Sequence, residues 1–331
     1  MNVAVVGAGS WGTTVAHICS HNAPTLLYSR RNDIAESINS TRENSRYLSG
    51  YSLHPDLRAS NDLAEVLIDA DVVVMGVPSH GFRAMLRDAL GHVPPGVPVV
   101  SLAKGLERGT NLRMTQIIDE ELPGHPVGVL TGPNLAKEIL AGQAAAAVIA
   151  LVDAEVAARL QAVFSTDLFR VYTNTDVIGC ELAGALKNII ALASGMADGL
   201  GAGDNTRAAV MTRGLAELTR LGVALGGEPA TFAGLAGMGD LVATCISRQS
   251  RNRHVGEELG KGRTIAAIAE EMKQVAEGVK SAPVIVELAR EVGVDMPIAE
   301  QIRAVVEGDC TATEAYRGLL QRPQTAEHIG P

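Results

Sequence analysis

The chain has 331 residues, of which 47% are hydrophobic and 20% are charged. This composition is typical of a globular protein with a sizeable core, and it argues against a disordered chain. The length suggests about two domains. The formal net charge of −9 disfavours nonspecific binding to nucleic acid or to an anionic membrane, but it leaves room for a local basic pocket that binds a small phosphate.

Cysteine and histidine spacing bears on redox and metal sites. The four cysteines lie far apart and form no CxxC motif, so we expect reduced thiols and a cytoplasmic protein. The eight histidines form no HExxH motif, and we expect no closely spaced pair and therefore no metal site. The first residues lack a basic, apolar leader, and no apolar run is long enough for a membrane span, so we expect neither a signal peptide nor a transmembrane helix.

Short apolar runs alternate with helical patterns in the first half of the chain. The expected strands are Val3–Val6, Leu26–Tyr28, Val72–Met75, Val97–Leu102, Val127–Leu130 and Ala145–Ala150. The expected helices are Trp11–Ser20, Ile34–Ser40, Leu63–Asp69 and Gly81–Leu90. This alternation predicts an α/β fold with a doubly wound parallel sheet, whose strands read as continuous apolar runs because helices cover both faces.

Helical periodicity dominates after residue 175. The expected helices are Asp176–Leu200, Thr206–Leu225, Thr264–Met272, Ser281–Val292 and Ile298–Glu307. We therefore predict two domains, an α/β domain over 1–175 and an all-helical domain over 176–331. Arg322–Pro331 is expected to form a polar tail.

The segment from Gly7 to Gly12 reads GAGSWG, a GxGxxG pattern. The pattern alone is weak, but here it follows a predicted strand and opens a predicted helix, which is the context that dinucleotide binding requires. The first glycine allows the tight turn, the second lets the backbone approach a pyrophosphate, and the third allows close packing of helix on strand. A glycine-rich turn without a ligand is the alternative.

The end of the second predicted strand bears on the choice between NAD(H) and NADP(H). An acidic residue there binds the ribose 2′-hydroxyl, and arginine favours a 2′-phosphate. This chain has Arg30 and Arg31 at the tip, so NADP(H) is accommodated, while Asp33 could still serve NAD(H). The alternative is that the two arginines form a solvated turn.

Two lysines stand where chemistry is expected. Lys104 follows a predicted strand, and ligands bind at the carboxyl ends of such strands. Lys187 lies in a long apolar helix beside small residues, with no pairing partner three or four residues away. Poor solvation and a nearby cation, for which Lys104 is one candidate, would suit it to general acid/base work. A lysine at the helix flank is the alternative.

Three further segments carry polar groups. Pro133 and Asn134 follow a strand and indicate a strand-to-helix turn with Asn134 as the cap, whose backbone N–H groups could face substrate. The glycines of GMGD indicate that Asp240 lies in a turn between two helices, where an N-cap is the competing reading. Residues 250–253 read SRNR, and its two arginines indicate an anion-binding cluster or else a solvated turn.

Seven motifs occur in this order over most of the chain: GAGSWG, SLAKGLE, GPNLAKE, ELAGALKN, GMGDL followed by TC, SRNR and VAEG. With this set the sequence resembles the bacterial-type NAD(P)-dependent glycerol-3-phosphate dehydrogenase family. The resemblance implies an NAD(P)-binding Rossmann domain over 1–175, a helical substrate-binding and catalytic domain over 176–331, and a homodimer. It also implies reversible reduction of dihydroxyacetone phosphate to sn-glycerol 3-phosphate, which supplies glycerophospholipid synthesis.

The resemblance also assigns roles to residues. It implies Lys187 as the catalytic general acid/base. It implies substrate binding by Lys104, Gly132, Asn134, Lys187, Asp240, Ser250, Arg251 and Asn252. It implies cofactor binding by Gly7, Gly9, Ser10, Trp11, Gly12, Arg30, Arg31, Lys104, Ala136, Arg251, Val275 and Glu277. The family usually has serine at the position of Asn134, so that contact departs from its pattern.

Two other functions remain open on the sequence. One is a related β-hydroxyacid or 6-phosphogluconate-type dehydrogenase, which shares the two-domain plan and a catalytic lysine. SRNR and LAGALKN argue against it. The other is a protein that senses NAD(P)H without catalysis, which would not need Lys104, Lys187 and Asp240 together. Turnover with a panel of phosphorylated and carboxylated substrates separates the three.

Overall fold

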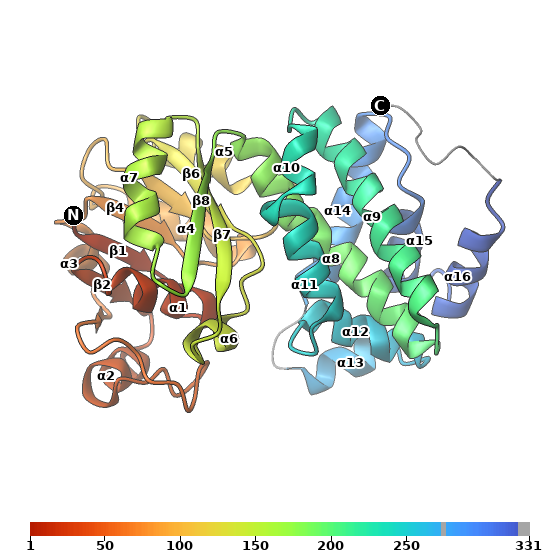
Figure 1. Cartoon of the computed structure of the whole chain (residues 1–331), viewed down its shortest axis with the longest axis horizontal. Helices are drawn as coiled ribbons and strands as arrows, with labels where there is room; N and C mark the ends of the chain where they lie inside the picture. The colour runs from red at the N-terminus through yellow and green to blue at the C-terminus, as the bar shows by residue number, and fades with distance from the viewer. Residues whose placement is uncertain (273–275, 324–331) are drawn as a thin grey trace. The chain divides into compact units, whose positions relative to one another are not determined.

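The computed structural model describes residues 1–272 and 276–323 (Figure 1). The chain forms two compact units, residues 1–177 and 178–331. The sequence places the division between the two predicted domains at residue 175.

The first unit contains an eight-stranded sheet in the order β3-β2-β1-β4-β5-β6-β7-β8. Its strands are β1 (Val3–Val6), β2 (Thr25–Tyr28), β3 (Arg58–Ser60), β4 (Val72–Met75), β5 (Val99–Ser101), β6 (Val127–Thr131), β7 (Ala145–Leu151) and β8 (Phe169–Asn174). The first six are parallel, in the strand order of the Rossmann fold. The predicted α/β class with a doubly wound parallel sheet is therefore confirmed over these six strands.

The sheet departs from the prediction at its far edge. β7 pairs antiparallel with β6, and β8 pairs parallel with β7, so the last two strands run against the first six. At the reversal, a Cβ on Gly128 of β6 would lie 2.4 Å from the backbone oxygen of Ala150. Glycine therefore allows the two backbones to approach closely at this crossing.

Helices cover both faces of this sheet, and β1 and β4 are buried along their whole length. Val5 and Val74 belong to the core on one face, and Val6 and Met75 to the core on the other. The helices of this unit are α1 (Ser10–Cys19), α2 (Asn32–Thr41), α3 (Leu63–Leu67), α4 (Ser79–Ala89), α5 (Met114–Glu121), α6 (Ala136–Leu140) and α7 (Ala154–Phe164). The sequence analysis did not identify β3, β8, α5 or α7.

The second unit is helical throughout its described part (Figure 1). Its helices are α8 (Val177–Gly199), α9 (Asp204–Ala224), α10 (Pro229–Ala233), the π-helical segment η1 (Leu235–Gly239), α11 (Asp240–Ile246), α12 (Arg251–Gly260), α13 (Ile265–Glu271), α14 (Glu277–Glu291), α15 (Pro297–Glu307) and α16 (Ala312–Leu320). The sequence analysis did not identify α10, η1, α11, α12 or α16. Of the expected polar tail, residues 324–331 lie outside the described part of the chain.

Helix α8 is the centre of the second unit's core. Glycines bring two neighbouring helices close to it: a Cβ on Gly214 of α9 would lie 2.5 Å from the Ile190 side chain, and one on Gly195 of α8 would lie 2.0 Å from the backbone oxygen of Arg253. By length and hydropathy, Val177–Gly199 could cross a membrane, but 94% of its most apolar window is buried inside the fold. It is therefore a core helix by its packing.

Candidate functional site

The turn between β1 and α1 has the geometry that its three glycines predict. Gly7 has φ of +116°, and a Cβ there would lie 2.7 Å from the backbone oxygen of Gly76. A Cβ on Gly12 would lie 2.0 Å from the backbone oxygen of Gly7. Around the Cβ position of Gly9, by contrast, no described atom lies within 4 Å. The first and third glycines close the turn, and the second leaves its outer side open to a ligand.

Helix α1 presents free donors at this turn. Gly9 is its N-cap and supplies no side-chain cap, and the backbone N–H of Thr13 donates to the oxygen of Gly9 at 2.9 Å. The N–H groups of Ser10, Trp11 and Gly12 come before this bond and need partners from outside the helix. The helix dipole also favours an anion here. The predicted cofactor residues Ser10, Trp11 and Gly12 therefore lie where a helix start favours an anion.

The arginines at the end of β2 differ from one another. Arg31 is the N-cap residue of α2 and donates to Asp33 through Nε at 2.9 Å and through a terminal nitrogen at 2.7 Å. This bidentate pair holds the pKa of the Asp33 carboxyl below its usual range. The neighbouring Arg30 is exposed. Arg31 was expected to favour NADP(H) and Asp33 to favour NAD(H). In the structure these two residues pair with each other.

The loops after β5 and β6 bring together Lys104 and Gly132, two predicted substrate residues. The Lys104 Nζ donates to the backbone oxygen of Gly132 at 2.9 Å. Gly132 has φ of +138°, and a Cβ on it would lie 3.0 Å from the Cα of Ala147. Its lack of a side chain thus lets the loop after β6 pass close to β7.

The prediction that Asn134 caps a helix is wrong. Helix α6 begins at Ala136, and its N-cap is Leu135. Both amide atoms of Asn134 are buried, as is the Thr131 hydroxyl, and none of these atoms has a hydrogen-bond partner among the described residues. Since buried amides are normally paired, this side chain has bonding capacity left for a ligand.

In the second unit, Lys187 of α8 lies beside Asp240, the first residue of α11. Lys187 is 4% exposed and Asp240 is 2% exposed, and the ammonium donates to the carboxylate. The lysine also donates to the Thr244 hydroxyl at 2.8 Å. The prediction that Asp240 lies in a turn is therefore wrong, because η1 and α11 place it in helical backbone.

Thr244 is a functional residue that sequence reasoning missed. It stands four residues after Asp240, so the two share one face of α11, and that spacing was the available signal. The sequence analysis looked for a cation near Lys187. The charged partner that the structure gives the lysine within the second unit is instead the Asp240 carboxylate, which attracts the ammonium rather than repelling it.

The SRNR segment opens helix α12. Ser250 is the N-cap, and its hydroxyl accepts from the backbone N–H of Arg253 at 3.2 Å. Arg253, one of the two arginines that were predicted to bind an anion, forms an ion pair with Asp198 at 2.6 Å. Its guanidinium therefore has a partner within the second unit. Arg251 is exposed at the first position of the helix. The segment is thus a helix start and not a solvated turn.

The buried Asn252 connects three helices. Its Nδ2 donates to the Asn188 Oδ1 at 2.9 Å, and its Oδ1 accepts from the backbone N–H of Gly278 at 2.9 Å. It therefore joins α8, the helix that carries Lys187, to the start of α14. Glu277 begins α14. Val275, the other predicted cofactor residue of this segment, lies outside the described residues.

The cysteine near Lys187 is not an ionised nucleophile. Cys245 lies near the lysine, and burial raises its thiol pKa to about 12, so the thiol stays neutral. Within residues 1–272 and 276–323, no group of three or more histidine, cysteine or acidic side chains could hold a metal ion.

The expectation of no closely spaced histidines is wrong. His17 lies in the last turn of α1 and His21 follows the end of that helix, and their Nε2 atoms are 3.5 Å apart. The backbone N–H of His54 donates to the Nδ1 of His17 at 2.9 Å. Because Nδ1 accepts this bond, the single proton of the neutral His17 imidazole lies on Nε2. A metal ion bound by both His17 and His21 would need a lone pair on that same atom.

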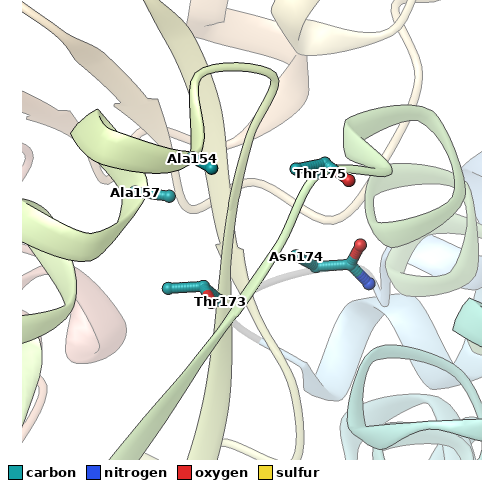
Figure 2. A pocket seen from close by; sticks show the side chains of 5 residues that line it. All are labelled: Ala154, Ala157, Thr173, Asn174 and Thr175. Atoms are coloured by element: carbon teal, nitrogen blue, oxygen red, sulfur yellow. The ribbon is translucent and has the colours of Figure 1, made fainter.

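A small hollow of about 280 Å³ lies where β8 ends beside α7. Figure 2 shows its lining side chains, Ala154 and Ala157 from α7 and Thr173, Asn174 and Thr175 from the end of β8. They offer methyl, hydroxyl and amide groups but no charge, and none of them is a predicted site residue. The chemistry-bearing groups lie elsewhere.

Comparison with known proteins covers nearly the whole chain. Residues 2–157 match the N-terminal domain of NAD-dependent glycerol-3-phosphate dehydrogenase, and residues 176–317 match its C-terminal domain. Among curated relatives, glycerol-3-phosphate dehydrogenase (NAD(P)+) 2 of Sphingopyxis alaskensis is 60% identical over 321 residues, which are 97% of this chain and 96% of the relative. The Mycobacterium avium enzyme of the same activity is 56% identical over 319 residues, 96% of this chain and 94% of the relative.

A solved structure agrees with these matches. The crystal structure of glycerol-3-phosphate dehydrogenase from Coxiella burnetii superposes with a TM-score of 0.91 at 34% identity, and the alignment covers 97% of this chain and 99% of that one. Both domains, the glycine-rich turn and the buried lysine are thus found in one chain that matches these proteins over almost its full length. The chain belongs to the NAD-dependent glycerol-3-phosphate dehydrogenase family.

Proposed function

We propose that this protein catalyses the reversible, NAD(P)H-dependent reduction of dihydroxyacetone phosphate to sn-glycerol 3-phosphate. The observation that carries the proposal is the buried ammonium of Lys187, held by Asp240 and Thr244 in a chain of this family. A lysine fixed in this way is a proton donor aimed at one place, which a carbonyl reduction needs.

The residues present fit a dinucleotide cofactor. The open side of Gly9 and the unpaired N–H groups of Ser10 and Trp11 would hold its pyrophosphate, and Arg30 lies where a 2′-phosphate would be read. The reduced nicotinamide, when bound, supplies the hydride that the carbonyl carbon C2 receives.

The protein's own part is to manage a proton. As C2 gains a hydride, its oxygen becomes an alkoxide, and Lys187 donates a proton from Nζ to that oxygen. In the oxidative direction the neutral amine takes the hydroxyl proton back. Asp240 and Thr244 accept hydrogen bonds from the ammonium and so fix the direction in which Nζ points.

Substrate orientation falls to the remaining residues. Arg251 and the first turn of α12 suit the phosphate, because a guanidinium forks onto phosphate oxygens and the helix dipole adds to the attraction. Lys104, Gly132 and Asn134 would hold the hydroxyl oxygens, and the amide atoms of Asn134 have no other partner among the described residues.

The test is absorbance of the reduced nicotinamide in the presence of dihydroxyacetone phosphate, first with NADPH and then with NADH. Lys187→Ala is expected to lower kcat by about 10²- to 10⁴-fold while NADPH still binds. The control is Lys261→Ala, because the exposed Lys261 pairs with Glu257 and Glu258 in the same unit and such a pair at the surface contributes little.

Two results would overturn the proposal. Near-normal kcat in Lys187→Ala would remove this residue from proton transfer. A wild-type protein that binds NADPH but turns over only carboxylated substrates would point to a β-hydroxyacid dehydrogenase instead, and one without any turnover would point to a cofactor sensor.

The family membership also supports finer expectations about the protein's setting. We expect a homodimer in the cytoplasm that supplies glycerol 3-phosphate to phospholipid synthesis. Light scattering coupled to size-exclusion chromatography measures the first, and glycerol auxotrophy of a deletion strain measures the last. A monomeric mass that is independent of protein concentration would contradict the dimer.

A further inference from the structure

The loop between α2 and β3 reaches back to the glycine-rich turn through one buried side chain. Asn44 has no exposed surface. Its Nδ2 donates to the backbone oxygen of Ala8 at 3.0 Å and to the Thr13 Oγ1 at 2.9 Å. Its Oδ1 accepts from the backbone N–H of Tyr47 at 3.2 Å. Both amide hydrogens are therefore used on the segment that begins α1.

The bond to Ala8 fixes the direction of a neighbouring donor. Ala8 and Gly9 share one peptide group, and in a planar trans peptide the C=O and N–H point in opposite directions. Because Asn44 holds the Ala8 oxygen on the buried side, the N–H of Gly9 is turned to the other side. A Cβ built on Gly9 would also meet no described atom within 4 Å, so this glycine leaves room for a ligand at the turn.

We infer that Asn44 is a positioning residue for cofactor binding, which orients the Gly9 N–H toward the cofactor pyrophosphate and secures the first turn of α1 through Thr13. This inference rests on the proposed function only in requiring that a dinucleotide binds at the turn. Without Asn44, the Ala8–Gly9 peptide can rotate, and the N–H loses its fixed direction.

The same part of the chain contains a matched control. Asn39 of α2 is also an asparagine that bridges two segments: its Nδ2 donates to the backbone oxygen of Ala59 at 2.7 Å, and its Oδ1 accepts from the backbone N–H of Ala59 at 2.9 Å. It joins α2 to β3 but makes no bond to the turn. A general loss of order in this region should therefore follow from either substitution.

The experiment measures the Kd of NADPH and of NADH for wild type, Asn44→Ala, Asn44→Asp and Asn39→Ala. Trp11 is the one tryptophan of the chain and lies in the first turn of α1, so quenching of its fluorescence reports binding without any turnover. Asn44→Asp keeps the volume and an acceptor for Tyr47 but places carboxylate oxygen where the two donors were. It decides the question if Asn44→Ala does not fold.

We expect both Asn44 variants to raise Kd about tenfold or more, by the same factor for the two cofactors because the pyrophosphate is common to them. The kcat at saturating cofactor and the KM for dihydroxyacetone phosphate should stay within about twofold. Wild-type Kd in Asn44→Asp, or an equal rise in Asn39→Ala, would overturn the inference. If none of the four proteins, wild type included, turned over dihydroxyacetone phosphate, the proposed reaction would be wrong. The Kd values would still decide whether Asn44 positions the turn for cofactor binding.

Discussion

The Thr244 hydroxyl donates to the backbone oxygen of Asp240 at 2.6 Å and accepts from the Nζ of Lys187 at 2.8 Å. Because its one hydrogen is used within α11, only its lone pairs face the lysine. The hydroxyl therefore acts as a fixed acceptor that works together with the Asp240 carboxylate to aim the ammonium.

Thr244→Val keeps the shape of the side chain and removes that acceptor. We expect kcat to fall about 5- to 50-fold, since a buried charge-assisted hydrogen bond is lost, with little change in the Kd of NADPH. Thr244→Ser should restore most of the activity. Steady-state kinetics at saturating cofactor measure this, and equal kcat in the valine and serine variants would rule out the acceptor role.

The second and third glycines of the turn should respond differently to alanine. Gly9→Ala meets no described protein atom, so it should leave the Tm within about 2 °C of wild type and weaken cofactor binding strongly. Gly12→Ala puts a methyl group 2.0 Å from the Gly7 oxygen and should lower the Tm by several degrees. Calorimetry with and without NADPH compares them. A destabilised Gly9→Ala protein would show that the open side is filled by protein.

Cofactor preference should depend on Arg30 and Asp33 in opposite directions. Arg30→Ala removes an exposed guanidinium from the end of β2 and should raise the KM for NADPH about tenfold while leaving the KM for NADH nearly unchanged. Asp33→Asn frees Arg31 from its bidentate partner and should shift preference toward NADPH. The measurement is the ratio of kcat/KM for NADPH to kcat/KM for NADH. If neither variant changes this ratio, the residues at the end of β2 do not recognise the 2′-phosphate.

Acid should weaken the first unit through His17. Burial, followed by the nearby His21 and His54, lowers its pKa from 6.5 to about 4. Between these values the unfolded chain holds a proton that the folded chain does not, so stability is full above about pH 6.5 and falls as the pH drops toward about 4. Unfolding near pH 5 should take up about one extra proton at this site.

The test of this pH dependence is His17→Gln, in which the amide oxygen can still accept from the His54 backbone. The fall in Tm between about pH 6.5 and 4.5 should be smaller than in wild type. His125→Gln is the control, because His125 contacts the backbone oxygen of Val97 away from this histidine cluster. Identical pH profiles for wild type and His17→Gln would exclude His17 as the cause.

The parts of the site that sequence predicts well are those whose geometry is local. GAGSWG follows a buried strand directly, and the three glycine roles depend on contacts inside the turn and with the neighbouring strand end. Strands β1 and β4 match the expected ranges for the same reason, because a short run of consecutive valines is typical of a strand that is buried on both faces of a sheet.

Other parts depend on partners far along the chain. Lys187 and Asp240 are 53 residues apart, and Asn44 and Ala8 are 36 apart, so no spacing rule indicates either contact. Asn134 looked like a cap because it follows proline, but α6 begins only at Ala136. The reversal at β7 was also hidden, because an apolar strand has the same pattern in both directions.

The π-helical segment η1 sets how tolerant this region is to changes in chain length. In η1 the hydrogen-bonded ring is one residue wider than in an α-helix, and Gly237 fits there because a Cβ would lie 2.1 Å from the Phe232 oxygen. Each residue turns a helix by about 100°. Removing one residue from 235–239 would therefore swing Asp240 away from Lys187 while every side chain of the pair is kept. The number of residues in this segment therefore matters to the site as much as the identity of the two residues that form the pair.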